Sequence, residues 1–234
     1  DGTVAMTSDV PFPLAGFRNR IINGGFAVNQ RAVSGTVVLA AGIYGHDRWK
    51  AGASGCTYTF STASNVTTLT ISAGSLQQVI EGRNLQSGTH TLSWAGTAQG
   101  NIAGGSYSAS GVTGSAIGGA NLTIEFNTGT VSTVQLEVGP TATAFEQRPY
   151  GVELALCQRY LPPVSNSPGV IYSATNAYVS STYPVTPRVA PTGVTVTALG
   201  VLLVGGVGIA VTSTAFTTAG TAGALLQLAF ASGG

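Results

Sequence analysis

The chain contains very little charge. Its 234 residues include nine basic and eight acidic side chains, 7% of the total, against roughly 25% in an average globular protein. With a net charge of +1 and a single lysine, the chain is not expected to form a basic surface for a polyphosphate backbone, which argues against nucleic-acid binding. A hydrophobic content of 44% nevertheless indicates packed structure rather than a flexible linker.

Cysteine and histidine are also scarce, with two of each. Cys56 and Cys157 lie 101 residues apart and form no metal-binding motif, so neither a metal nor a cofactor is expected. Buried free thiols are the expectation, with a disulfide as the alternative. The glycine run at residues 205–208 lacks the strand–helix context of a nucleotide-binding loop.

Neither end of the chain predicts a membrane segment. Residues 1–17 have no basic start and no long apolar core, and Pro11 and Pro13 favour an extended connector over a helix. Residues 194–212 are uncharged, but they contain four glycines and three threonines. The alternation of Val and Thr at residues 194–197 indicates strands, so membrane insertion is not expected.

Short segments of alternating polar and apolar residues dominate the first two thirds of the chain. This alternation is typical of half-buried antiparallel strands, and Gly-rich turns separate the segments. The clearest examples are residues 56–60, 67–71, 90–94, 121–126 and 133–138. Ile21 and Ile22 also fit a strand, followed by a turn at residues 23–25. The pattern predicts an all-β fold, an antiparallel jelly-roll-like β-sandwich.

One short helix is expected at residues 151–161. Glu153 near its start and Arg159 near its end suit the helix dipole, and Val152, Ala155 and Leu156 share one face. Prolines 162 and 163 end it. The predicted organisation is a connector (1–17), a β-sandwich (18–150), this helix (151–161) and a C-terminal β region for oligomerisation or tip contacts (162–234).

The C-terminal region is almost free of charge. After Tyr160 the only charged residue is Arg188, although apolar residues remain frequent. A unit of this composition would be poorly soluble alone, so we expect it to be buried against copies of the same chain.

Most charged residues fall into two blocks. Six lie between Arg18 and Lys50 and five between Val134 and Tyr160. In so neutral a chain, this clustering predicts that the blocks meet in space, where a partly buried ion pair would fix geometry more than it adds stability. We expect Asp47 or Arg48 to pair with one of three residues of the second block: Glu137, Glu146 or Arg148.

Aromatic residues are the candidate ligand contacts. Aromatic rings cover the apolar C–H faces of sugars, while neighbouring amides bind the hydroxyls. The candidate ligand-binding residues are Trp94, Tyr107, Tyr44, Tyr172 and Tyr178. The alternative for each is a place in the core or in a turn. Arg48 beside Trp49 is likewise a candidate contact, with a structural role as the favoured alternative.

No catalytic arrangement is predicted. A glycosidase needs two carboxylates about 5–10 Å apart, and Glu81 and Glu125 are the candidates. Glu81 has Arg83 nearby and Glu125 lies on an alternating strand, so both are interpreted as structural. His46 and Asp47 do not predict a Ser-His-Asp catalytic triad, because serine is so common in this chain that no single serine stands out as the nucleophile.

The two charged blocks resemble those of tail-fibre and receptor-binding proteins of tailed bacteriophages and prophages. The similarity rests on residues 18–26, on Asp47, Arg48 and Trp49, and most specifically on residues 134–160. It covers residues 18–160 well and 161–192 loosely. The chain departs from the pattern at three positions: Ala144, Gln147 and Leu161.

The resemblance implies a component of a virion fibre or spike. Its β-sandwich would be similar to carbohydrate-binding modules, and the chain would form a homotrimer, contact other virion proteins and bind a host surface polysaccharide or glycan. It would be made in the host cytoplasm and act at the virion surface. The alternative is a structural head-fibre, spike or decoration protein without receptor binding. A depolymerase is a third possibility, but we predict no enzyme.

Overall fold

A computed structural model describes residues 17–163, 169–173, 175–193, 201–204 and 207–230. Except for Phe17, the expected N-terminal connector lies outside these residues. The alternating run at 194–197 and two glycines of the run at 205–208 lie outside them as well.

The larger of two antiparallel sheets spans residues 37–138. Its strand order is β1-β2-β3-β8-β4-β6, while β7 pairs with β3 and β5 pairs with β7. A short 3₁₀ turn, Gly82–Asn84, follows β3. The strands are β1 (Val37–Leu39), β2 (Lys50–Ala63), β3 (Val66–Ile80), β4 (Gly88–Ala95), β5 (Gly100–Ile102), β6 (Val112–Ala116), β7 (Leu122–Phe126) and β8 (Gly129–Val138).

Strand β3 changes partner along its length. Leu69 to Ile71 pair with β8, whereas Leu76 to Ile80 pair with β7. Between these stretches the ladder of β2 and β3 shifts register, with Gly55 and Gly74 at positive φ angles of 81° and 70°. A side chain at Gly74 would overlap the Gly55 carbonyl. This glycine-dependent irregularity allows β3 to pair with β8 over one part of its length and with β7 over the other.

Alternate residues along the strands of the larger sheet face one apolar core. Strand β7 shows the pattern most clearly, since Leu122, Ile124 and Phe126 are buried and the residues between them are not fully covered. The rings of Trp49 and Trp94 pack against Phe126, with ring centroids 6.1 Å and 4.9 Å away. The strands predicted from alternation at residues 56–60, 67–71, 90–94, 121–126 and 133–138 are therefore confirmed.

The chain before β1 is irregular. The strand expected at Ile21 and Ile22 is wrong, because neither residue lies in a strand. The turn after them is confirmed: the Phe26 N–H donates to the Asn23 carbonyl at 3.1 Å, and Asn23 has a φ of 59°.

Helix α1 (Tyr150–Gln158) packs on this irregular segment. The expected helix is confirmed, but its buried face differs from the prediction. Cys157 is buried against Ile22 and Val28, whereas Val152 is exposed. Both cysteines are free and buried, so the disulfide alternative is wrong.

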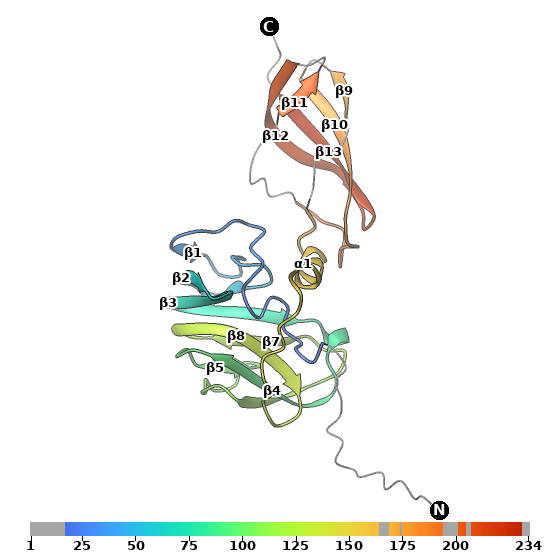
Figure 1. The fold of residues 1–234 in the computed structure, drawn as a ribbon. Coiled ribbons are helices and arrows are strands. Elements are labelled where there is room, and N and C mark those ends of the chain that lie inside the picture. The colour runs from blue at the N-terminus through green and yellow to red at the C-terminus, as the bar shows by residue number, and fades with distance from the viewer. Residues whose placement is uncertain (1–16, 164–168, 174, 194–200, 205–206, 231–234) are drawn as a thin grey trace, which may run out of the picture.

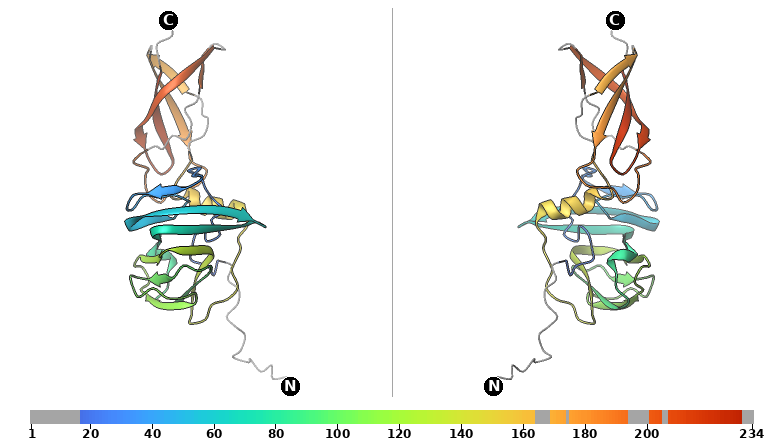
Figure 2. Two further views of the ribbon diagram at one scale, coloured as in Figure 1. Left: turned by 90° about the vertical axis from the view of Figure 1, so that its left-hand side faces the viewer. Right: turned by 90° about the vertical axis from the view of Figure 1, so that its right-hand side faces the viewer.

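The smaller antiparallel sheet has the order β11-β12-β13-β10-β9. Figures 1 and 2 show it beyond the side of the larger sheet that carries β1, β2 and α1, while β4 and β5 lie on the far side. In the described residues, no helix is long and apolar enough to span a membrane. The strands are β9 (Gly169–Ser173), β10 (Asn176–Thr182), β11 (Val201–Val204), β12 (Val207–Ala219) and β13 (Gly223–Phe230).

Candidate functional site

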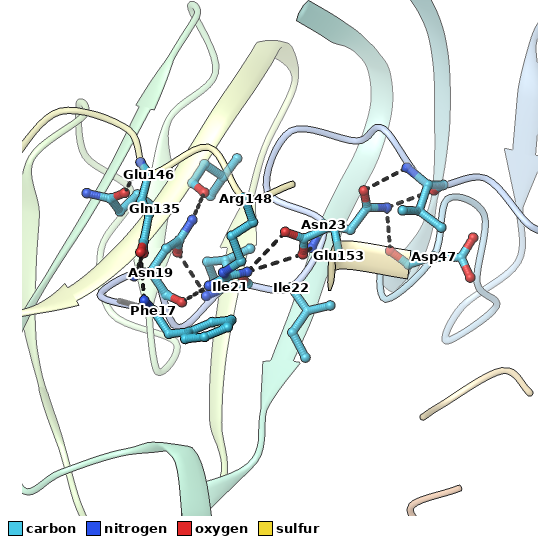
Figure 3. Close-up of polar contacts among 12 residues, drawn as sticks. Phe17, Asn19, Ile21, Ile22, Asn23, Asp47, Gln135, Glu146, Arg148 and Glu153 are labelled. Carbon is cyan, nitrogen blue, oxygen red and sulfur yellow. Dashed lines mark hydrogen bonds and ion pairs between the residues drawn. The ribbon is translucent and has the colours of Figure 1, made fainter. Parts of the chain in front are cut away.

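The two charged blocks meet at the irregular segment before β1 (Figure 3). The Glu146 carboxylate accepts the N–H groups of Phe17 and Asn19 at 2.6 Å and 2.7 Å. Arg148 donates to the carbonyl of Ile21 at 2.9 Å and also to that of Asn19. This segment shares only two backbone hydrogen bonds with β8, from the Arg20 N–H to the Leu136 carbonyl and from the Val134 N–H to the Gly24 carbonyl. Ionised side chains therefore satisfy backbone groups that a continuous ladder would otherwise satisfy.

Buried amide side chains complete this network. Gln78 forms two hydrogen bonds with the backbone of Ile22, at 2.9 Å and 2.8 Å. Asn19 accepts the N–H groups of Ile21 and Leu136 and donates to the carbonyl of Val134. The segment is thereby fixed against β3 and β8.

The ion pair expected between the blocks is wrong. Asp47 accepts the backbone N–H and the side-chain amide of Gln30, at 2.6 Å and 2.7 Å. Glu137 binds Gln135 and Thr143. Arg148 pairs within its own block, with Glu153 at 3.1 Å. Of the residues expected to pair, Glu146 and Arg148 instead bind backbone groups of the irregular segment.

Arg48 faces away from this network. Its guanidinium carbon lies 3.5 Å from the centre of the Tyr160 ring, and one terminal nitrogen donates to the Val79 carbonyl. Arg48 is 7% exposed, and its buried Nε has no hydrogen-bond partner among the residues that the structure describes. Burial lowers the pKa of Arg48, while nearby Tyr160, Tyr44, Cys157 and Glu81 oppose that shift. A guanidinium remains charged nonetheless, so this is a buried, partly satisfied cation.

Arg48 lines a cleft of about 1090 Å³ between the larger sheet and the chain after α1. One wall comes from the segment before β2, including Arg31 and Tyr44. Residues 81–83 and Asn121 also line it, and the opposite wall comes from residues 159–163 and 187–193 with Tyr183.

The cleft concentrates positive charge. Five of the eight arginines line it, with two carboxylates, those of Asp47 and Glu81. Asp47 is held by Gln30, and Glu81 pairs with Arg188 at 3.3 Å and Arg159 at 3.6 Å. In the described part of the chain, the other three arginines have no carboxylate partner within 4 Å. They are Arg31, Arg48 and Arg83.

Three tyrosines accompany these arginines. Tyr44 lies beneath Arg31, whose guanidinium carbon is 5.3 Å from the ring centre. Burial raises the pKa of Tyr160, partly offset by Arg48. The Tyr183 hydroxyl is buried without a hydrogen-bond partner among the described residues. The cleft therefore combines aromatic faces with cationic and hydroxyl donors.

Of the predicted contacts that the structure describes, Tyr44 and Arg48 line this cleft. Trp94 belongs to the core, where its indole N–H donates to the Ala98 carbonyl at 3.0 Å. Tyr107 is 38% exposed beside Glu125, outside the cleft lining. Tyr178 is half-buried on β10, and the side chain of Tyr172 lies outside what the structure describes.

Sequence reasoning missed Arg31, Arg83 and Tyr183 as members of one site. Arg31 belongs to the first charged block and Arg83 follows a strand, but nothing in their spacing places either opposite Tyr183. The cleft forms only where the chain after α1 returns to the larger sheet. There, the Arg188 N–H donates to the Arg159 carbonyl at 2.8 Å.

The two carboxylates considered for catalysis both bind other side chains. Glu81 forms the two ion pairs described above, and Glu125 accepts a hydrogen bond from Ser75. His46 is buried against Tyr58, with its Nδ1 2.9 Å from the phenolic oxygen. Among the described residues, no group of three His, Cys, Asp or Glu side chains could hold a metal ion.

Comparison of the chain with protein-family models, with curated proteins and with solved structures finds no match. The fold defines a mostly β protein with two antiparallel sheets and one short helix. Its most distinctive described feature is the arginine- and tyrosine-lined cleft.

Proposed function

We propose that this chain is a component of a virion fibre or spike, and that it binds a host surface glycan in the cleft between the larger sheet and residues 159–193. The observation that carries this proposal is the lining of the cleft, where Tyr44, Tyr160 and Tyr183 accompany five arginines. Its volume of about 1090 Å³ is near the range of small-ligand sites, roughly 300–1,000 Å³.

The chemistry of the lining suits a saccharide. Tyrosine rings and the proline-rich wall at residues 187–191 can pack against the apolar faces of sugar rings. Guanidinium groups and the side chain of Asn121 can bind sugar hydroxyls. A site of this kind needs no catalytic group, so the proposed activity is binding and not hydrolysis.

The place on a virion rests on the sequence resemblance to phage tail-fibre and receptor-binding proteins. In this proposal the larger sheet is a jelly-roll-like sandwich similar to carbohydrate-binding modules, and residues 162–234 form the interface of a homotrimer. The chain then contacts other virion proteins and acts at the virion surface after synthesis in the host cytoplasm.

A structural head-fibre, spike or decoration protein is the second candidate. It is favoured by edge strand β9, where Val170 is 71% exposed and could pack against another subunit. In this alternative the chain assembles but binds no host glycan.

A cell-binding assay with the full chain distinguishes the two. We expect the labelled protein to bind host cells and at least one glycan on an array, and Tyr44→Ala to weaken that binding at least about tenfold. Tyr150→Ala is the control, because Tyr150 is exposed at the start of α1, outside the cleft lining. Absence of binding to any host cell or glycan would favour the structural role. Release of reducing ends from host polysaccharide would contradict a purely binding role.

A further inference from the structure

The cleft holds more positive charge than its own acids neutralise. Its five arginines face two carboxylates, and both carboxylates already have partners inside the cleft. The whole chain has a net charge of only +1. The excess is therefore local, and a concave wall lined by one sign of charge attracts the opposite sign.

Arg48 gives this charge a fixed position. It is more than nine-tenths buried and stacked on Tyr160, and its Nε has no hydrogen-bond partner in the part of the chain that the structure describes. A buried guanidinium with unused donors is costly unless an anion or another acceptor completes it. Among the described residues, the Tyr183 hydroxyl and the Oε2 atom of Glu81 are also buried without a hydrogen-bond partner, and both residues line the same cleft.

We propose that the cleft binds a carboxylate-bearing sugar, with Arg31, Arg48 and Arg83 as the anion-binding residues. This inference rests on the proposed function, since it names the class of glycan that the cleft takes. The planar fork of a guanidinium matches the two oxygens of a carboxylate, and charge-assisted bonds of this kind are about twice as strong as neutral ones. Tyr44, beneath Arg31, supplies an aromatic face for the sugar ring beside the charged group.

A matched pair of probes tests the charge directly. Methyl glucuronide and methyl glucoside differ only by a carboxylate in place of a primary alcohol, and each can be titrated into the full chain by NMR at millimolar concentration. We expect the glucuronide to bind at least about tenfold more tightly, the scale of one charge-assisted hydrogen bond. We also expect the preference to fall as salt is raised.

Arg83→Gln is the main variant, because Arg83 is exposed and forms no ion pair among the described residues, so its loss should leave the fold intact. It should remove most of the preference for the glucuronide. Arg18→Gln is the matched control, since Arg18 is outside the cleft lining and donates to Thr143; it should retain the preference.

The outcomes separate this inference from the proposed function. Equal binding of both probes, or failure of both probes while host glycans still bind, overturns the inference and leaves glycan binding standing. Tighter binding of glucose 6-sulfate than of the glucuronide would also overturn it, since the anion would then be a sulfate ester. A preference that survives Arg83→Gln and Arg31→Gln would place the anion elsewhere. Absence of binding to every glycan and host cell tested would refute the proposed function itself.

Discussion

At the residue scale, the charges next to the irregular segment act mainly on backbone atoms. Arg148 donates to the carbonyl oxygens of Asn19 and Ile21 and also pairs with Glu153. A buried side chain with several partners is difficult to replace, because each polar group left without a partner costs about 1–3 kcal/mol.

Arg148→Leu should therefore be strongly destabilising. We expect the free energy of unfolding, measured by urea denaturation, to fall by about 3–5 kcal/mol. Two carbonyls lose a donor, and Glu153 loses its ion pair and keeps only the Asn23 N–H. Arg18→Leu removes a bond to Thr143 at an exposed position and should change stability by no more than about 0.5 kcal/mol. Similar small losses for both variants would show that the Arg148 contacts do not hold the segment in place.

His46 makes stability depend on pH. Burial lowers the pKa of His46 from 6.5 to about 4, so below pH 6.5 the unfolded chain binds a proton that the folded chain does not. Stability from this group is therefore complete above pH 6.5 and decreases as pH falls toward 4, by about 3 kcal/mol at most. Urea midpoints at pH 7.5 and 4.5 should differ less in His46→Gln than in the parent, because the other ionisable groups are common to both. Equal pH dependence in the two proteins would contradict this.

The clustering of charge predicted that the two blocks meet, and they do, but it could not predict their partners. Alternation of polar and apolar residues identifies segments that pair in a ladder. It gives no sign that Asn19 and residues 21–23 are buried outside a ladder. It therefore does not reveal which N–H and C=O groups need Glu146, Arg148 or Gln78.

At the element scale, the strands were predictable and their pairing was not. Strand β7 follows the alternation seen in the sequence, yet its place beside the second half of β3 depends on the irregularity near Gly55 and Gly74. In a chain with 33 glycines, the residues next to Gly74 do not indicate that it lies against the backbone of Gly55.

Gly74→Ala tests whether this irregularity is required. Gly74 has a φ of 70°, and an added Cβ would overlap the carbonyl of Gly55. Gly42→Ala is a close control, because Gly42 has a φ of 75° with nothing within 4 Å of the added atom. Both variants place an alanine at a positive φ angle. The free energy of unfolding, measured by urea denaturation, should therefore fall by about 1–3 kcal/mol more in Gly74→Ala than in Gly42→Ala, and this difference measures the cost of the overlap. Equal losses would mean that β2 and β3 adjust without cost.

At the scale of the whole molecule, the cleft depends on two parts of the chain that lie far apart in sequence. Glu81 follows β3, and its partners Arg159 and Arg188 lie at the end of α1 and after β10. Composition predicted that the region after Tyr160 is distinct, because it holds one charged residue. It could not predict that this residue returns to the larger sheet and closes a site there.

The homotrimer remains a prediction, and a truncation tests it together with the cleft. The apolar core of the larger sheet lies within residues 21–136, and the smaller cluster around Cys157 ends at Tyr160, so residues 1–163 should fold without the rest. Light scattering should give about three times 23.4 kDa for the full chain and a monomer for the truncated one, because the nearly neutral C-terminal region needs copies of itself to cover its apolar surface.

The truncated protein should also lose glycan binding, since residues 183 and 187–193 form one wall of the cleft. Circular dichroism with cooperative thermal unfolding is the control for folding. A full chain that is monomeric at micromolar concentration would refute the trimer, and a truncated chain that stays trimeric would place the interface in the larger sheet.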